Sequence, residues 1–233
     1  MRITIRRFSR LFLAAIVTLS LLPAGQASAV ILNSNKDVPK SQRFLDYVGS
    51  LQLANVIYPL GVEQYRKSGL KMDCADKFVV HPISLLVLTP IDFPDDRQNP
   101  VKGSWIYRYS LTRGGDSKIY NAMIFADEAG ETPKAQAFYP GTSAAHPMLI
   151  YDAMPIAIST AMVQCGSTDI EDVEVFDLHL DKLPYDIGEG ENLVKGAWNE
   201  TWTFKVRGKQ VEVPITFTPN PRKGKPLFMI NTK

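Results

Sequence analysis

Apolar residues recur at every second position in two parts of the chain, each containing a glycine turn and a return segment. In the C-terminal part these positions are Trp198, Glu200 (the polar exception), Trp202, Phe204 and Val206, and then Val211, Val213, Ile215 and Phe217. In the earlier part they are Trp105, Tyr107, Tyr109 and Leu111, and the return segment is 119–125. A period of two predicts strands with one buried face, and the turns at 114–116 and 207–210 predict two β-hairpins.

The two predicted hairpins begin with nearly the same sequence, VKGSW at 101–105 and VKGAW at 194–198. A constant offset of 93 residues (198 − 105) aligns their strands and also aligns Gly115 with Gly208. Upstream of each hairpin lies an apolar strand-like run, 78–88 and 173–180, preceded by a Cys and by a helix-like segment. We therefore predict an α+β protein of two tandem αβββ units, with mostly antiparallel sheets covered by helices.

The predicted helices are 41–58 and 148–164. In the first, one stripe contains Phe44, Val48, Leu51, Asn55 and Tyr58. In the second, Pro155 predicts a helix start or a kink, and Thr142 or Ser143 is the expected N-cap. The predicted organisation is a leader at 1–29, a first unit at 30–140 and a second at 141–233, with one pseudo-symmetric domain as the alternative.

The first 29 residues have the pattern of a secretory signal peptide. Four arginines precede an uncharged apolar run at 11–22, and Ala27-Ser28-Ala29 resembles a cleavage site. The run is shorter than the about 20 residues that span a bilayer, although a retained anchor is the alternative. We expect a periplasmic or secreted bacterial protein that begins at Val30, with no transmembrane segment after the leader is removed.

Removal of the leader changes the charge. The whole chain has a net charge of +2, whereas the exported chain has 26 − 4 = 22 Lys+Arg against 24 Asp+Glu, a net charge of −2. This balance gives no support to nucleic-acid binding. Acidic residues are concentrated at 169–191 and basic residues at 195–233. In one interpretation these two stretches face each other or solvent. In the other, the basic stretch forms a face that binds an anionic partner.

Candidate chemistry is sparse. Cys74 and Cys165 predict a disulfide in an exported chain, with two separate buried thiols as the alternative. The three histidines, His81, His146 and His179, have no metal-ligand spacing, so no metal or cofactor is predicted. Ser143 and His146 lack the strained turn that exposes a nucleophilic serine in hydrolases.

The binding candidates are Trp105, Tyr109, Glu200 and Trp202. The aromatic residues could form a stacking platform, although aromatic residues at strand spacing are more often core. Glu200 lies among tryptophans, where burial would perturb it, unless the strand edge is wet or Lys195 or Arg108 pairs with it. The first hypothesis is a non-enzymatic protein that binds another protein or an envelope component. A small-ligand module with a cleft between the units is the second, and a hydrolase using Ser143 and His146, or His81 and His179, is the third.

Overall fold

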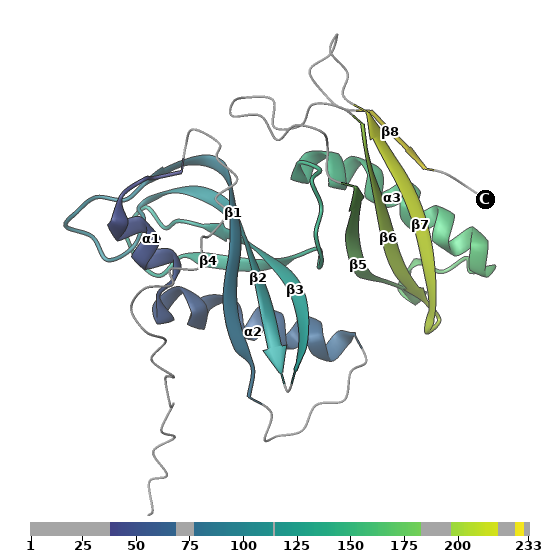
Figure 1. Ribbon diagram of the computed structural model, residues 1–233, viewed down its shortest axis with the longest axis horizontal. Helices are drawn as coiled ribbons and strands as arrows, with labels where there is room; N and C mark the ends of the chain where they lie inside the picture. The colour runs from purple at the N-terminus through teal and green to yellow at the C-terminus, as the bar shows by residue number, and fades with distance from the viewer. Residues whose placement is uncertain (1–37, 69–76, 114, 183–196, 219–226, 231–233) are drawn as a thin grey trace, which may run out of the picture.

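The strands form two four-stranded antiparallel sheets in the computed structural model, which describes residues 38–68, 77–113, 115–182, 197–218 and 227–230 (Figure 1). In both sheets, strands that are consecutive in the chain are neighbours. The first sheet contains β1 (Val79–Asp92), β2 (Lys102–Arg113), β3 (Asp116–Phe125) and β4 (Lys134–Phe138). The second contains β5 (Val173–Lys182), β6 (Trp198–Val206), β7 (Lys209–Thr218) and β8 (Leu227–Ile230). The α+β class and the two predicted hairpins are confirmed.

The short fourth strands were missed by the sequence analysis. β4, with the sequence KAQAF, lies near the end of the predicted first unit, and β8 has only four residues. Neither has a long alternating pattern, so pairing with β3 and β7 decides their conformation.

Two helices, not one, precede the first sheet: α1 (Gln42–Val48) and α2 (Leu51–Lys67). The Ser41 and Ser50 hydroxyls cap them by accepting hydrogen bonds from the amides of Phe44 and Leu53. Because a new helix starts after Ser50, the buried positions do not continue the spacing of the first helix. The predicted line of buried residues is therefore wrong beyond Val48. Leu51 is 63% exposed, and the buried positions of α2 are instead Leu53, Ile57, Gly61 and Tyr65.

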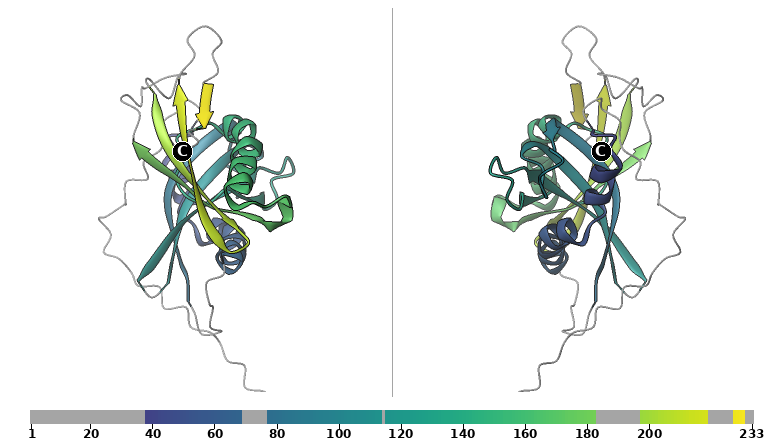
Figure 2. Two further views of the ribbon diagram at one scale, coloured as in Figure 1. Left: turned by 90° about the vertical axis from the view of Figure 1, so that its right-hand side faces the viewer. Right: turned by 90° about the vertical axis from the view of Figure 1, so that its left-hand side faces the viewer.

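The second sheet is covered by α3 (Pro147–Cys165), which lies along one of its faces (Figure 2). The side chain of His146, rather than Thr142 or Ser143, caps this helix by accepting a hydrogen bond from the Met148 amide. Pro155 lies inside the helix. The alanines at 153, 157 and 161 are fully buried, and they allow the helix to approach the inner side chains of β6 and β7 closely.

Length and composition alone would allow α3 to cross a membrane. The sequence analysis had not singled out this segment as long and apolar enough to do so. Within the fold, however, one side of α3 packs on the second sheet, in a cluster with Trp202, Phe204 and Phe217. The other side is exposed and mostly apolar.

The two sheets meet at strands that are not equivalent. The junction segment (residues 139–146) runs between β3 of the first sheet and β5 of the second. The Gly141 amide donates to the carbonyl of Ile119, and Gly141 forms a parallel bridge with Leu178. The Leu178 amide in turn donates to the carbonyl of Pro140. The third strand of one sheet is therefore joined to the first strand of the other.

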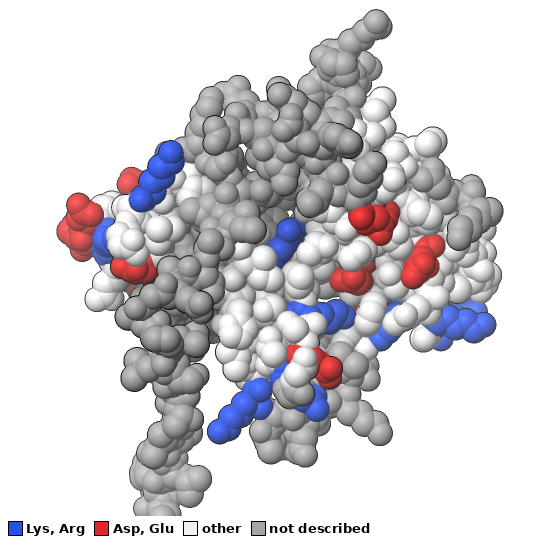
Figure 3. Space-filling view, viewed as in Figure 1, with Lys and Arg blue, Asp and Glu red and all other residues white. Residues whose placement is uncertain are grey.

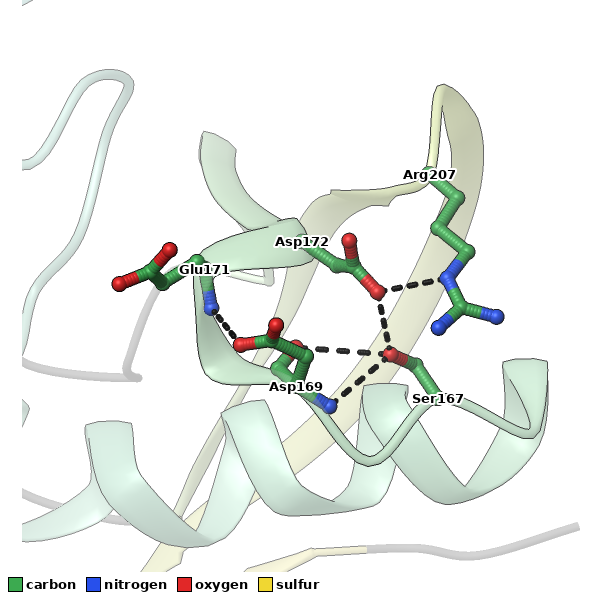
Figure 4. A network of polar contacts seen from close by, with 5 residues as sticks. All are labelled: Ser167, Asp169, Glu171, Asp172 and Arg207. Carbon is green, nitrogen blue, oxygen red and sulfur yellow. Dashed lines mark hydrogen bonds and ion pairs between the residues drawn. The ribbon is translucent and has the colours of Figure 1, made fainter.

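A tight two-residue turn connects β6 and β7. Arg207 and Gly208 both have positive φ, 50° and 79°, as a type I′ hairpin turn requires. Arg207 is held in this unusual conformation by Asp172, because its amide donates to the Asp172 carbonyl and its Nε donates to the carboxylate at 2.6 Å (Figure 4). The Ser167 hydroxyl donates to the same carboxylate oxygen at 2.8 Å. This network joins the short 3-10 helix η1 (Ile170–Asp172) to the hairpin tip.

The Asp172 network predicts an acid-dependent loss of stability. Hydrogen bonds from Ser167 and Arg207 lower the pKa of Asp172 below its ordinary value of 3.8. A lowered folded-state pKa stabilises the fold above pH 3.8, and this contribution is lost as pH falls through the folded-state pKa. The stability difference between wild type and Asp172→Asn should therefore be largest near neutral pH and shrink in acid. Urea unfolding at several pH values measures it; Asp152→Asn, at an exposed site on α3, is the control.

Candidate functional site

The most elaborate polar site surrounds the carboxylate of Glu200, which is fully buried. The Trp198 and Trp202 indoles donate to Oε1 and Oε2 at 2.9 and 2.8 Å. The Ser143 hydroxyl lies 2.9 and 2.8 Å from the same two oxygens, and the Ala144 amide donates to Oε1 at 2.9 Å. Each oxygen therefore accepts from an indole and has further donors around it.

The first sheet reaches this site through Arg108 on β2. Its Nη2 donates to the carbonyl of Ser143 at 3.0 Å, and its Nε donates to Oδ1 of Asn121 at 2.9 Å. The Asn121 side-chain nitrogen donates to the carbonyls of Tyr139 and Gly141 at 2.7 and 3.0 Å. Burial lowers the pKa of the Arg108 guanidinium, and the negative charge of Glu200 opposes that shift. Arg108, Asn121 and Glu200 thus clamp the junction segment from both sheets.

The local sequence explains how the carboxylate becomes buried. The alternation of β6 places Trp198, Glu200 and Trp202 on the inner face, so the two indoles flank the carboxylate along the strand. Hydrogen-bond donors arrive from the junction segment, where the Ser143 hydroxyl also accepts from the Ala145 amide. The sequence analysis identified Glu200 and considered Arg108 as its partner. It named Ser143 only as a possible N-cap or nucleophile, and it missed Ala144 and Asn121. Lys195, the other suggested partner, lies outside the described residues.

This arrangement suits an anchor better than a reaction centre. The two oxygens of Glu200 already accept hydrogen bonds from two indoles, a hydroxyl and a backbone amide, so they are occupied by donors of the fold itself. The complete burial of this carboxylate also separates it from solvent and from any substrate at the surface. The chemistry available here is stabilisation of the junction between the sheets.

The predicted binding residues lie in two different cores. Trp105 and Tyr109 belong to the core under α1 and α2, whereas Trp202 belongs to the core under α3. All three, like Glu200, have no exposed surface. A stacking platform needs exposed ring faces, so the core interpretation describes these aromatic residues.

The hydrolase candidates are not assembled into a catalytic arrangement. The Ser143 hydroxyl donates to Glu200, and Nδ1 of His146 accepts the cap bond from Met148. His81 and His179 lie exposed on β1 and β5, in different sheets. Within the described ranges, no group of three or more His, Cys, Asp or Glu side chains could hold a metal ion.

The predicted disulfide is not found. Cys165 is a free thiol at the end of α3, and Cys74 lies outside the described residues. Cys165 packs with the core under α3 as a small apolar side chain, as free cysteines often do.

The basic C-terminal stretch does not form an open cationic face in its described part. Lys205 donates to the carbonyl of Ser68 and lies over the ring of Phe176, and Arg207 pairs with Asp172. Lys205 also pairs in register with Glu174 across β5 and β6. Basic and acidic side chains are interspersed on the face seen in Figure 3. The acidic and basic stretches thus meet each other where they are described.

An open hollow of about 300 Å³ lies where the two halves of the chain meet. Its lining comes from α2, β4, the junction segment, α3 and β5: Gln64, Ala137, Phe138, Tyr139, Pro140, Tyr151 and Val175. The rings of Phe138, Tyr139 and Tyr151 pack edge to face, with centroids 5.0 to 6.0 Å apart. Burial raises the pKa of Tyr139. The sequence analysis singled out none of these residues, because they come from five elements and share no local pattern.

A scan against protein-family models and searches of curated proteins and of solved structures found no match to this chain.

Proposed function

We propose that this chain is an exported, non-enzymatic protein that binds another protein through the outer face of α3. We define that face by the exposed residues of the helix: Met148, Tyr151, Asp152, Pro155, Ile156, Ser159, Val163 and Gln164. The observation that carries the proposal is the exposure of its large apolar side chains. Met148, Tyr151, Ile156 and Val163 are 60%, 44%, 51% and 80% exposed. A continuous exposed apolar surface of this kind is typical of interaction sites.

The polar groups of this face are suited to contact with an apolar surface. The Ser159 and Thr160 hydroxyls donate to the carbonyls of Pro155 and Ile156, each at 2.9 Å. These donors would therefore stay satisfied when a partner excludes water, and no desolvation penalty for an unpaired hydroxyl would arise. Asp152 is the only charged residue in the helix.

The charge of α3 favours a protein partner over a membrane surface. Helices that lie on anionic membranes usually carry Lys or Arg along their polar side. α3 has no basic residue, and Asp152 would be repelled by acidic lipids. An apolar helix or strand of another protein imposes no such requirement.

The non-enzymatic part of the proposal is supported by the state of the catalytic candidates. The Ser143 hydroxyl, which belongs to the junction segment, donates its hydrogen bond to the buried Glu200 carboxylate. His146 caps α3. Export is supported by the sequence of the leader alone, which lies outside the described residues.

Site-specific photo-crosslinking in the producing cells tests the proposal. A benzophenone residue placed at position 163, near the C-terminal end of α3, should form a discrete protein adduct. The same residue at position 51, which is also exposed (63%, against 80% for Val163) but lies on α2, should not. Adding Ile156→Lys should weaken the adduct at 163 at least tenfold, because a charge left unpaired in an interface costs about 2–5 kcal/mol. Intact mass of the purified chain, expected to begin at Val30, reports export in the same preparation.

Three results would refute the proposed interface. Equal adducts at positions 51 and 163 would indicate non-specific contact. Adducts with lipid alone would favour a membrane surface. An adduct at 163 that survives Ile156→Lys would show that the apolar side chains of the outer face do not hold the partner.

We also infer that the two halves arose by tandem duplication. The pairs Trp105↔Ile124 in the first sheet and Trp198↔Phe217 in the second differ by 93 residues in both members. The same shift relates Ile124↔Ala135 to Phe217↔Phe228, which involve the fourth strands. The offset that aligns the VKG-x-W sequences thus also aligns the strand register, including strands that the sequence comparison never used. A shared register over three strands supports a common origin.

A further inference from the structure

We propose that the free edge of β8 binds an extended segment of another protein as an additional strand, and that this segment has acidic residues at its ends. β8 is the last strand of the second sheet, beyond β7 (Figure 1). It pairs with β7 along one edge, and no described segment pairs with its other edge. In an antiparallel pair, alternate residues direct their N–H and C=O groups away from the neighbouring strand. The free edge of β8 therefore offers backbone donors and acceptors to a further strand, at a surface separate from the outer face of α3.

The other three edges of the two described sheets have features that prevent such pairing. β1 contains two prolines, and its pairing with β2 is interrupted by three register shifts. β4 begins with Lys134, and the carbonyl of its last residue, Phe138, accepts a hydrogen bond from α2. The outer edge of β5 is occupied by the junction segment, through the bridge between Gly141 and Leu178. Prolines, charges, irregular pairing and covering segments are the usual protection of edge strands.

β8 has none of these features within its own four residues, whose sequence is LFMI. Phe228 and Ile230 pack against the core under α3, whereas Leu227 and Met229 are 59% and 62% exposed. Because side chains alternate along a strand, the two exposed residues lie on the face opposite to α3. They can pack beside the side chains of an added strand, as cross-strand neighbours do. An apolar edge without protection is the kind of edge that pairs with another chain.

The charge of the chain around β8 favours an acidic partner over a second copy. Residues 219–233 contain four basic residues and no acidic residue. Lys225 precedes β8 by two residues and Lys233 follows it by three. Chain connectivity alone therefore keeps their Cα atoms within about 7 and 11 Å of the two ends of the strand. Two copies paired through β8 would bring these like charges together, whereas acidic ends on the added segment would be attracted to them.

Fluorescence polarisation with labelled synthetic peptides and the exported chain tests this inference. The probe Ac-EEVTVTVEE-NH₂ should bind, and the same peptide with lysines in place of the glutamates should bind at least tenfold more weakly. Successive amides of a strand point to opposite edges, so N-methylation of the valines blocks one edge of the peptide and N-methylation of the threonines blocks the other. One methylated peptide should lose binding and the other should keep it.

Met229→Glu and Met148→Glu are a matched pair of variants, because the two methionines are 62% and 60% exposed. Met229→Glu places a negative charge beside the acidic segment and should weaken peptide binding at least tenfold. Met148→Glu, on the outer face of α3, should leave it unchanged. The inference is overturned if the acidic peptide does not bind, if the two methylated peptides bind equally, or if the two variants bind equally. A dimer of the chain in analytical ultracentrifugation that Met229→Glu dissociates would also overturn it, because a second copy would then occupy the edge.

Discussion

Replacing Glu200 by Gln is expected to remove about 1–3 kcal/mol from the free energy of unfolding, the usual cost of leaving a buried donor without its hydrogen-bond acceptor. Either orientation of the new amide places its NH₂ group against an indole N–H, because the two oxygens accept from Trp198 and Trp202 respectively. Arg108 also loses the negative charge that offsets its burial. Since a domain is stable by only about 5–15 kcal/mol, this single change should remove a large part of the protein's stability.

Urea unfolding followed by tryptophan fluorescence measures the effect of Glu200→Gln. The matched control is Glu212→Gln on the neighbouring strand β7, where the side chain is exposed and the change should stay within about 0.5 kcal/mol. Ser143→Ala removes one donor and should cost about 1–3 kcal/mol. Equal stabilities for the Glu200 and Glu212 variants would mean that the hydrogen bonds to the Glu200 carboxylate do not stabilise the junction between the sheets.

Gly141→Ala is expected to destabilise the fold by about 2–6 kcal/mol. Gly141 has φ of +91°, a conformation that strains other residues by about 1–3 kcal/mol. A β-carbon would also lie 2.7 Å from the Leu178 amide nitrogen, and would overlap the Leu178 carbonyl and the Asp177 carboxylate. Because two of these contacts are backbone atoms of β5, the junction would have to open, and overpacking adds about 1–3 kcal/mol.

Gly115→Ala separates the two contributions to that loss. Gly115 also has positive φ, +101°, but a β-carbon there would meet nothing within 4 Å. Its substitution should show only the backbone strain, so thermal unfolding should reveal a clearly larger loss for Gly141→Ala. Similar losses for both variants would show that the close approach of β5 to the junction segment contributes little.

The strongly periodic parts of the fold were predictable from local sequence. The alternation of β2, β3, β6 and β7 predicted both hairpins and their inner faces, because a strand with one buried face has a period of two. The same alternation placed Glu200 among tryptophans on the buried face. The predicted stripe of the first helix failed because a single serine, Ser50, ends one helical phase and begins another.

The sequence by itself therefore determined the hairpins, the α+β class and the position of Glu200 on the same strand face as the tryptophans, since each depends on neighbours within a few residues. Tertiary structure decided the partners of that carboxylate. Ser143 lies 57 residues before Glu200, and Arg108 acts from the other sheet. It also decided which side of α3 faces solvent, because apolar residues surround this helix and provide no periodic signal. The hollow formed by Gln64, Tyr139 and Tyr151 exists only where five elements converge, which no local pattern encodes.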